Sequence, residues 1–430
     1  MTLTTNTSVT QPGGLPEPEQ VFAFAEREIR KAGAELWPGA ELILGALVPS
    51  VTGYVRLLRV DGRELYAKYS YLGVSLVSLL RGVGGGWALV RWAQRTYTAC
   101  PEALLTSEAA QLRLLAAFGQ PKVCAVAGLR RGVLFTEPVT GPTLAAFLIA
   151  RPQEAGDLLE AAYGGLHRLH SPRISRAFDP VGAIGERGIV HTFQRKFNGL
   201  SGALYLDLLG IERCAEHERP EIVQLMRHVV ARLRRLRAAA GTSKPTVLVY
   251  GDLKPEHVFF PDGFFPDGPD SEPVFIDPGL LRASGPEADA AKLISRTVLL
   301  LAASRPSPSA SLRVLDGIAA FIDQRLSPLP RPERSEWLYA FLILWLMDTV
   351  NILTTYLSAP AALPLPGQGE ALVRQAVTLC GMADRISALL VGATGGTGVT
   401  DGTAALGCAL DRLLDRVLSE AAAAVAAVAP

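Results

Sequence analysis

Residues 249–258 read Val249-Tyr250-Gly251-Asp252-Leu253-Lys254-Pro255-Glu256-His257-Val258, and a second motif, Phe275-Ile276-Asp277-Pro278-Gly279, follows. In each motif an aspartate comes directly after an apolar run of β type. Transfer of a phosphoryl group needs one group that orients the attacking hydroxyl and accepts its proton, and others that hold metal ions against the phosphates. Two aspartates that follow neighbouring strands supply both, so we expect Asp252 and Asp277 to converge in one site.

Asp252 taken alone has a simpler interpretation, because a Gly-Asp pair is common in turns between strands. The Lys-Pro that follows it and the second motif at a suitable distance favour the catalytic interpretation. Further along, Asp289 in Gly285–Lys292 stands where a helix is expected to begin. It suits a helix cap, whereas the family resemblance given below implies a brace for the loop around Asp252, and we favour the brace.

The pattern around these motifs predicts an α+β protein. The first ~140 residues predict a small antiparallel sheet with one inserted helix, and Asp61-Gly62 is a strong hairpin signal. The expected strands are 41–48, 55–60, 64–69, 123–127 and 132–137, and the expected helix is 107–118. Later segments predict helices at 155–170 and 220–240, short β runs at 247–250, 257–260 and 274–276, and almost only helices beyond Asp289.

This order suggests three parts. Residues 1–18 are polar and predict a disordered tail. Residues 19–140 form a small nucleotide-binding lobe, and residues 141–430 form a large helical lobe that carries the catalytic loop at 250–258 and the acceptor site. The apolar insertion 71–105, with Gly84-Gly85-Gly86 near its middle, suggests a docking face for a protein partner, a peptide or a membrane surface.

The composition excludes several other classes. The 430 residues are 49% hydrophobic and 19% charged with a net charge of +1, which is typical of a globular protein and gives no basic face for nucleic acid. Five cysteines without a CxxC pattern predict reduced thiols and a cytoplasmic protein. The apolar stretch Leu338–Met347 is too short to span a membrane, which needs ~20 residues, so we expect a buried core helix and no transmembrane segment.

The two motifs resemble those of the aminoglycoside phosphotransferase family, whose catalytic loop reads roughly HGDxxPxN. The resemblance extends to macrolide phosphotransferases and lanthipeptide-type Ser/Thr peptide kinases, and it implies a bilobal protein-kinase-like fold that uses ATP or GTP with Mg²⁺. It makes Asp252 the catalytic base, with Lys254 beside it, and Asp277 the metal ligand. His257 replaces the usual Asn as second metal ligand, with Glu256 as an alternative.

The same resemblance assigns the nucleotide contacts in the small lobe. Lys68, on a strand after a hairpin, is expected to contact the α- and β-phosphates and to pair with Glu108 on the following helix. A lone strand lysine is otherwise most often solvated.

Two further segments complete the expected nucleotide site. The loop Pro49–Tyr54 would cover the phosphates through Ser50, Thr52 and Gly53. The segment Phe135–Gly141, which contains Glu137, would be the hinge that binds the purine edge. An ordinary hairpin and a strand ending in a Pro/Gly turn would have the same sequences, so only the context favours binding.

The acceptor is less defined. Residues 300–430 contain eleven acidic residues and nine arginines, which gives no strong negative field for a polycation. The apolar character of that region favours a natural product, or a Ser or Thr of a biosynthetic precursor peptide. A resistance kinase for a macrolide or aminoglycoside, and a pseudokinase scaffold that only binds nucleotide, are the alternatives.

Overall fold

The computed structural model describes residues 14–177, 184–185, 188–239, 247–261, 263, 272–395 and 403–428. Most of the expected tail 1–18 lies outside this range. The chain divides into two compact units. The first comprises residues 1–107, 126–137 and 360–364, and the second comprises 108–125, 138–359 and 365–430. The boundary after Glu137 lies close to the expected one at 140, but residues 108–125 group with the second unit.

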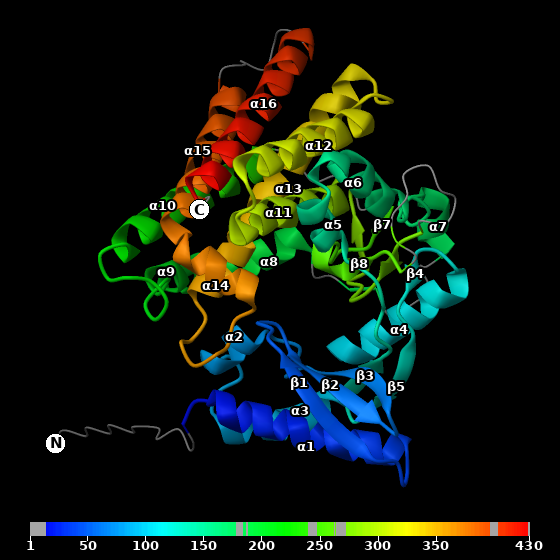
Figure 1. Cartoon of the computed structure of the whole chain (residues 1–430). Helices are drawn as coiled ribbons and strands as arrows, with labels where there is room; N and C mark the ends of the chain where they lie inside the picture. The colour runs from blue at the N-terminus through cyan, green and yellow to red at the C-terminus, as the bar shows by residue number, and fades with distance from the viewer. Residues whose placement is uncertain are drawn as a thin grey trace, which may run out of the picture. The chain divides into compact units, whose positions relative to one another are not determined.

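The first unit is built on a five-stranded antiparallel sheet with the order β1-β2-β3-β6-β5 (Figure 1). Its strands are β1 Leu42–Val48, β2 Tyr54–Val60, β3 Arg63–Tyr69, β5 Val126–Arg130 and β6 Val133–Thr136. Asp61 and Gly62 make the tight β2–β3 turn with φ of 47° and 83°, as the sequence predicted. Asx and Gly residues accept this left-handed conformation at low cost.

Three helices complete the first unit. They are α1 Pro18–Leu36, α2 Leu76–Leu80 and α3 Trp87–Tyr97. Helix α1 contacts strands β1, β3, β5 and β6. It buries Val21, Ala25, Ile29 and Ala32 completely, a spacing that places all four on one helical face. Helices α2 and α3 occupy the insertion 71–105.

The second unit holds two small sheets that present the catalytic motifs. One has the order β4-β9-β8, and the other pairs β10 with β7. The strands are β4 Lys122–Val123, β7 Val247–Val249, β8 Val258–Phe259, β9 Val274–Phe275 and β10 Leu281–Ala283. The catalytic loop runs from the end of β7 to a 3₁₀ turn at Pro255–His257, and Asp277 follows β9 directly. All three β runs expected here are present.

Helices form the rest of the second unit. The earlier ones are α4 Leu104–Phe118, α5 Leu144–Ala150, α6 Ala155–Gly164, α7 Pro172–Ala177, α8 Ile189–Lys196, α9 Gly199–Asp207 and α10 Arg219–Ala239. The first four residues of α4 belong to the first unit. A 3₁₀ turn at Pro152–Glu154 lies between α5 and α6. The later ones are α11 Glu287–Ser304, α12 Pro308–Leu326, α13 Arg331–Leu357, α14 Gly367–Arg374, α15 Ala376–Gly395 and α16 Thr403–Ala427.

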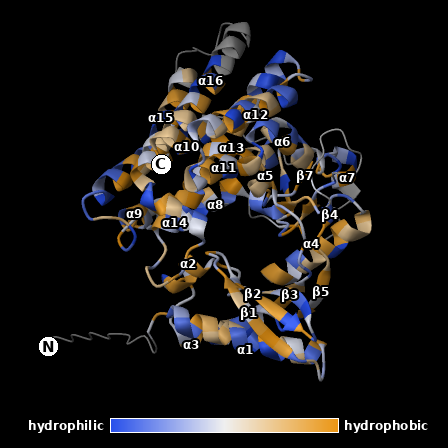
Figure 2. Cartoon of the chain, in the orientation of Figure 1, coloured by the Kyte–Doolittle hydropathy of each residue, from blue (hydrophilic) through white to orange (hydrophobic). Residues whose placement is uncertain are grey.

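Helices α11 and α13 supply much of the apolar core of this unit (Figure 2). Within the described residues, α13 and the segment Ala376–Ala393 of α15 are long and apolar enough to cross a membrane. However, 72% of the apolar window in α13 is buried inside the protein. This burial supports the expected core helix at Leu338–Met347, because such a helix passes the same test of length and composition.

One helix is shorter than the sequence predicted. The expected helix 155–170 ends at Gly164, and turns follow as far as Ser171. Gly165 lies against Phe275, whose ring would be 3.1 Å from an added Cβ. The close approach of the backbone to β9 and the flexibility of two adjacent glycines explain the early end. The turns bring His170 to the start of α11.

Candidate active site

The structure brings the two aspartates to opposite sides of one imidazole. His257 Nδ1 lies 3.8 Å from Asp252 Oδ2, and His257 Nε2 lies 3.5 Å from Asp277 Oδ2. The imidazole is mostly buried, while both carboxylates are about one-third exposed. The two motifs therefore form one site, and His257 lies between the two carboxylates. The resemblance described above makes His257 a metal ligand.

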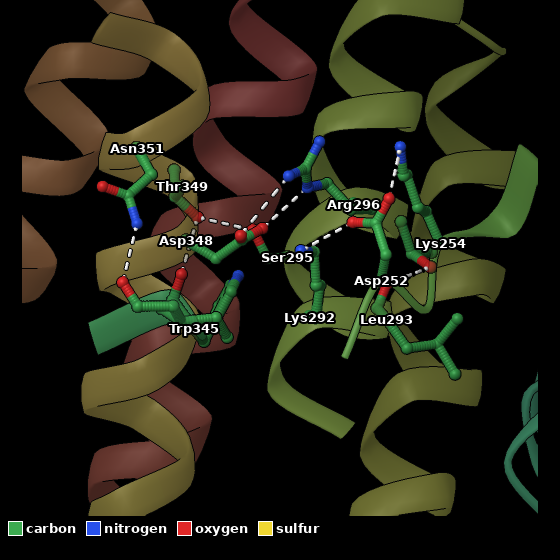
Figure 3. Close-up of polar contacts among 12 residues, drawn as sticks. Asp252, Lys254, Lys292, Leu293, Ser295, Arg296, Trp345, Asp348, Thr349 and Asn351 are labelled. Carbon is green, nitrogen blue, oxygen red and sulfur yellow. Dashed lines mark hydrogen bonds and ion pairs between the residues drawn. The ribbon is translucent and has the colours of Figure 1, made fainter. Parts of the chain in front are cut away.

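Two lysines hold the carboxylate of Asp252. Lys254 Nζ lies 3.0 Å from Oδ2, and Lys292 Nζ of α11 lies 2.7 Å from Oδ1 (Figure 3). Burial alone would raise the pKa of Asp252, but the charges of Lys254 and Lys292, with smaller contributions from His257 and Arg296, hold that pKa well below its usual value. Asp252 is therefore ionised across the neutral range and is able to accept a hydrogen bond from a hydroxyl.

The backbone at Gly251 fixes the direction in which Asp252 projects. Gly251 has a φ of 81°, and an added Cβ would lie 2.1 Å from the carbonyl oxygen of Gly279. That contact is far shorter than van der Waals distance, and both atoms belong to the loops that carry the aspartates. Only glycine fits here.

We therefore expect Gly251→Ala to shift the catalytic loop and to lower the free energy of unfolding by about 1–3 kcal/mol, the usual cost of a strained backbone position. Chemical denaturation measures this loss. Gly367→Ala is the matched control, because an added Cβ at Gly367 meets nothing within 4 Å. Equal stability of the two variants would contradict the proposed close contact.

Asp289 braces the catalytic loop, as the sequence analysis favoured. Its buried carboxylate accepts hydrogen bonds from the backbone N–H groups of Tyr250 at 2.7 Å and Gly251 at 2.8 Å. The Nε2 atom of His170 lies 3.0 Å from the same carboxylate. The backbone on the N-terminal side of Asp252 is therefore held by a side chain from the first turn of α11.

Replacing Asp289 by Ala leaves these two buried N–H groups without their acceptor, which costs about 1–3 kcal/mol for each unsatisfied group. We expect a lower unfolding midpoint and a lower turnover number. Asp289→Asn, which keeps one acceptor oxygen, should recover part of both. Measuring thermal unfolding and turnover side by side tests this order, and an alanine variant as stable as the wild type would contradict it.

The loop before Asp277 is tied to the catalytic loop by its backbone. The N–H of Ile276 donates to the carbonyl of His257 at 3.0 Å, and the hydroxyl of the buried Tyr250 donates to the carbonyl of Ile276 at 2.9 Å. Asp277 itself has a φ of 58°, in the left-handed region that single Asp residues accept at low cost. Tyr250, which replaces the family's usual His, has a structural role here.

Sequence reasoning missed Lys292, Arg296 and Asp348. Arg296 contacts Asp348 of α13 through Nε at 2.6 Å and Nη2 at 3.3 Å (Figure 3). Burial alone would lower the pKa of Arg296, but Asp348 raises it. Burial would likewise raise the pKa of Asp348, but Arg296, Lys292 and Ser295 together lower it. The spacing Asp289, Lys292, Arg296 places three charges on one helical face, and this i, i+3, i+7 signal could have been read from the sequence.

The residues expected at the phosphate-covering loop are close together in the first unit. Ser50 Oγ accepts from the N–H groups of Thr52 at 3.2 Å and Gly53 at 3.4 Å. These N–H groups therefore already have an acceptor, and a phosphate would have to compete with Ser50 for them.

The other expected nucleotide contacts belong to separate elements. Lys68 lies on β3, opposite Val55 and Leu134. Glu137 forms an ion pair with Arg63. Glu108 belongs to the second unit, and its pairing with Lys68 stays a prediction.

Asp277 offers the kind of oxygen ligand that magnesium prefers. Across the described ranges, no group of three or more His, Cys, Asp or Glu side chains is arranged to hold a metal ion. Magnesium is usually bound by one or two carboxylates together with waters and substrate phosphates. Asp277, a carboxylate with about one-third of its side chain exposed, supplies what such a site requires of the protein.

Comparisons with solved structures find distant similarity. An ethanolamine kinase from Plasmodium vivax is 11% identical with a TM-score of 0.43, covering 86% of this chain and 89% of that one. A choline kinase from Streptococcus pneumoniae is 13% identical with a TM-score of 0.40, covering 83% and 99%. A macrolide 2′-phosphotransferase from Brachybacterium faecium is 13% identical with a TM-score of 0.30, covering 91% and 98%.

No significant match was found among curated protein sequences. In contrast, the family model described as the phosphotransferase enzyme family, APH, matches residues 79–325. This range is more than half of the chain and contains both aspartate motifs, Lys254, His257, Asp289 and Lys292. The chain therefore belongs to the APH phosphotransferase family and has its protein-kinase-like fold.

Proposed function

We propose that this enzyme, a phosphotransferase acting on hydroxyl groups, transfers the γ-phosphoryl group of ATP or GTP to a natural product or to a Ser or Thr of a biosynthetic precursor peptide. The observation that carries the proposal is the convergence of Asp252 and Asp277 on His257. In this arrangement Asp252 accepts a hydrogen bond from the acceptor hydroxyl and takes its proton as the new O–P bond forms, while the bond from the γ-phosphorus to the β,γ-bridging oxygen breaks and the nucleoside diphosphate leaves. Lys254 compensates negative charge beside it.

On this proposal Asp277 and His257 would hold Mg²⁺, which would neutralise charge on the phosphates when bound. Phosphotransferases of this family use a nucleotide. We assign its phosphates to Lys68, with Glu108 as the partner of that lysine, and to Ser50, Thr52 and Gly53. The purine edge would contact the segment that contains Glu137.

The charges around Asp252 support a neutral or anionic acceptor over a polycationic one. Lys254 and Lys292 contact Asp252 directly, and Arg296 also lowers its pKa. A polycationic aminoglycoside would approach three positive side chains there. We therefore place a macrolide or an aminoglycoside second to a hydroxyl of an uncharged natural product or peptide. The enzyme is expected to act in the cytoplasm.

The proposal is tested with radiolabelled ATP and GTP and a panel of acceptors. The panel contains Ser/Thr peptides, a macrolide and an aminoglycoside, each tested with Mg²⁺ and with a chelator. We expect label on a peptide or an uncharged natural product, and none after chelation. Label on the aminoglycoside alone would overturn the acceptor assignment. The absence of any transfer, together with nucleotide binding, would favour the pseudokinase scaffold.

A further inference from the structure

Helix α3 of the insertion 71–105 has an unusual outer face. Leu89 and Trp92 are 54% and 67% exposed, and the nearby Val83 is 48% exposed. The side of a surface helix that points away from its protein is normally polar. These three large apolar side chains do not contribute to the core of the first unit, so their exposure on one short element calls for another explanation.

The inner face of α3 is firmly attached. Val90 and Gln94 are almost completely buried. The amide of Gln94 donates to the carbonyl of Ser70 and accepts from the N–H of Leu72, both at 2.8 Å. The ring of Trp87 packs edge-on against Phe24 of α1, with centroids 5.6 Å apart. The orientation of the helix is thus fixed, and its apolar outer face is not a result of loose packing.

The charges of α3 form a third sector. At 3.6 residues per turn, Val90 and Gln94 lie on one side, Leu89 and Trp92 lie on the opposite side, and the exposed Arg91 and Arg95 lie between them. Residues 70–101 contain these two arginines and Arg81 but no Asp or Glu. The outer surface of α3 therefore combines apolar side chains with positive charge and has no acidic residue of its own.

We propose that α3 docks the enzyme on an anionic lipid surface, with Leu89 and Trp92 at the boundary between headgroups and acyl chains and Arg91 and Arg95 at the headgroups. A helix with one apolar face, flanking arginines and an exposed tryptophan has the features of interfacial helices. Tryptophan is enriched at that depth, and the cytoplasmic leaflet is negatively charged.

A second copy of this chain fits the surface less well. A twofold interface places the same patch of both subunits together, so the arginines of one α3 would lie close to those of the other without an acidic partner from the same segment. Anionic headgroups neutralise the arginines. Two exposed acidic residues of the first unit, Glu17 and Glu19, come shortly after Gly14 in the chain. The carbonyl of Gly14 accepts a hydrogen bond from the N–H of Trp87 at the start of α3. The negative charge of these two glutamates should make the binding of α3 to anionic lipid weaker than the binding of a purely basic helix.

The test is co-sedimentation of the full chain with vesicles of phosphatidylcholine alone or with an equal part of phosphatidylglycerol. We expect binding to the mixed vesicles that weakens in high salt. The variant Arg91→Gln/Arg95→Gln should bind about 25-fold more weakly, since each arginine near the surface contributes about fivefold. The variant Leu89→Ser/Trp92→Ser should lose at least about tenfold.

The matched control is Leu312→Ser on α12 of the second unit, where an apolar side chain is 53% exposed. It should bind vesicles like the wild type. Equal loss in this control, or no sedimentation of the wild type with the mixed vesicles, would overturn the proposal. A wild-type dimer that Trp92→Ser dissociates, without vesicle binding, would assign the face to a second copy instead.

Discussion

Replacing Asp252 by Asn is expected to lower phosphoryl transfer by about 10²–10⁴-fold, the usual contribution of a positioned general base. The amide keeps the size of the side chain but no longer accepts a proton or attracts Lys254 and Lys292, which lie 3.0 and 2.7 Å from the carboxylate. The measurement is the turnover number with the best acceptor of the panel, together with slow ATP hydrolysis in its absence.

Two controls make this result specific. Asp323→Asn, at an exposed position of α12, should leave turnover unchanged. Nucleotide binding by the Asp252→Asn variant should stay close to that of the wild type, because the expected nucleotide contacts lie elsewhere. If Asp252→Asn changes neither turnover nor any other activity of the protein, the scaffold alternative gains support and the catalytic role of Asp252 is wrong.

Breaking the buried ion pair between Arg296 and Asp348 is the change with the largest expected effect on stability. Asp348 is 4% and Arg296 12% exposed, and two hydrogen bonds join them. Removing one partner leaves the other charge buried, so Arg296→Met or Asp348→Asn should cost about 3–5 kcal/mol. Urea denaturation followed by circular dichroism measures this cost.

The double variant Arg296→Met/Asp348→Leu separates a buried charge from simple loss of packing. Because two apolar side chains leave no charge behind, we expect it to be more stable than either single variant. The control is Arg385→Met, which breaks an exposed pair with Glu420 at 2.6 Å and should cost less than about 1 kcal/mol. A double variant less stable than both single variants would contradict this explanation.

The same pair predicts a dependence on pH. Burial opposes ionisation of Asp348, but Arg296, with smaller contributions from Lys292 and Ser295, lowers its folded-state pKa. The ionised carboxylate therefore stabilises the fold above its unfolded-state pKa of about 3.9, and this stabilisation is lost as pH falls through the lower folded-state value. Wild type and Asp348→Asn should thus approach equal stability in acid. A difference that persists there would show that the loss is not electrostatic.

The local sequence predicted much of the first unit and the two motifs. The Asp61-Gly62 turn and the strands around it follow from short-range rules, because glycine and aspartate tolerate the left-handed conformation and alternating strands bury one face. The catalytic loop and Asp277 were recognised from their motifs, because in each the aspartate follows a short apolar run of β type. The roles assigned to Lys68, Glu108 and the Ser50–Gly53 loop remain predictions.

Lys292 shows what the sequence did not reveal. Lys292 is one of several polar residues on one face of α11, and the opposite face is apolar. No residue next to it in the chain identifies Asp252 as its partner. Only the packing of α11 against the catalytic loop brings its ammonium group to Asp252. The same holds for Asp348, whose arginine partner lies on another helix and fifty-two positions earlier.

The sequence by itself determined the family, most of the strands and the two carboxylates, because short motifs and local turn rules carry them. It predicted one inserted helix after β3, where the structure has α2, α3 and α4, and one strand at 123–127, where the structure has β4 and β5. The tertiary structure decided which charges surround Asp252, how His170 and Asp289 hold its loop, and that helix 155–164 ends early. Those features depend on contacts between segments far apart in the chain. The packing of α11 against the catalytic loop and α13 places the charges, and the close approach of Gly165 to Phe275 of β9 ends the helix.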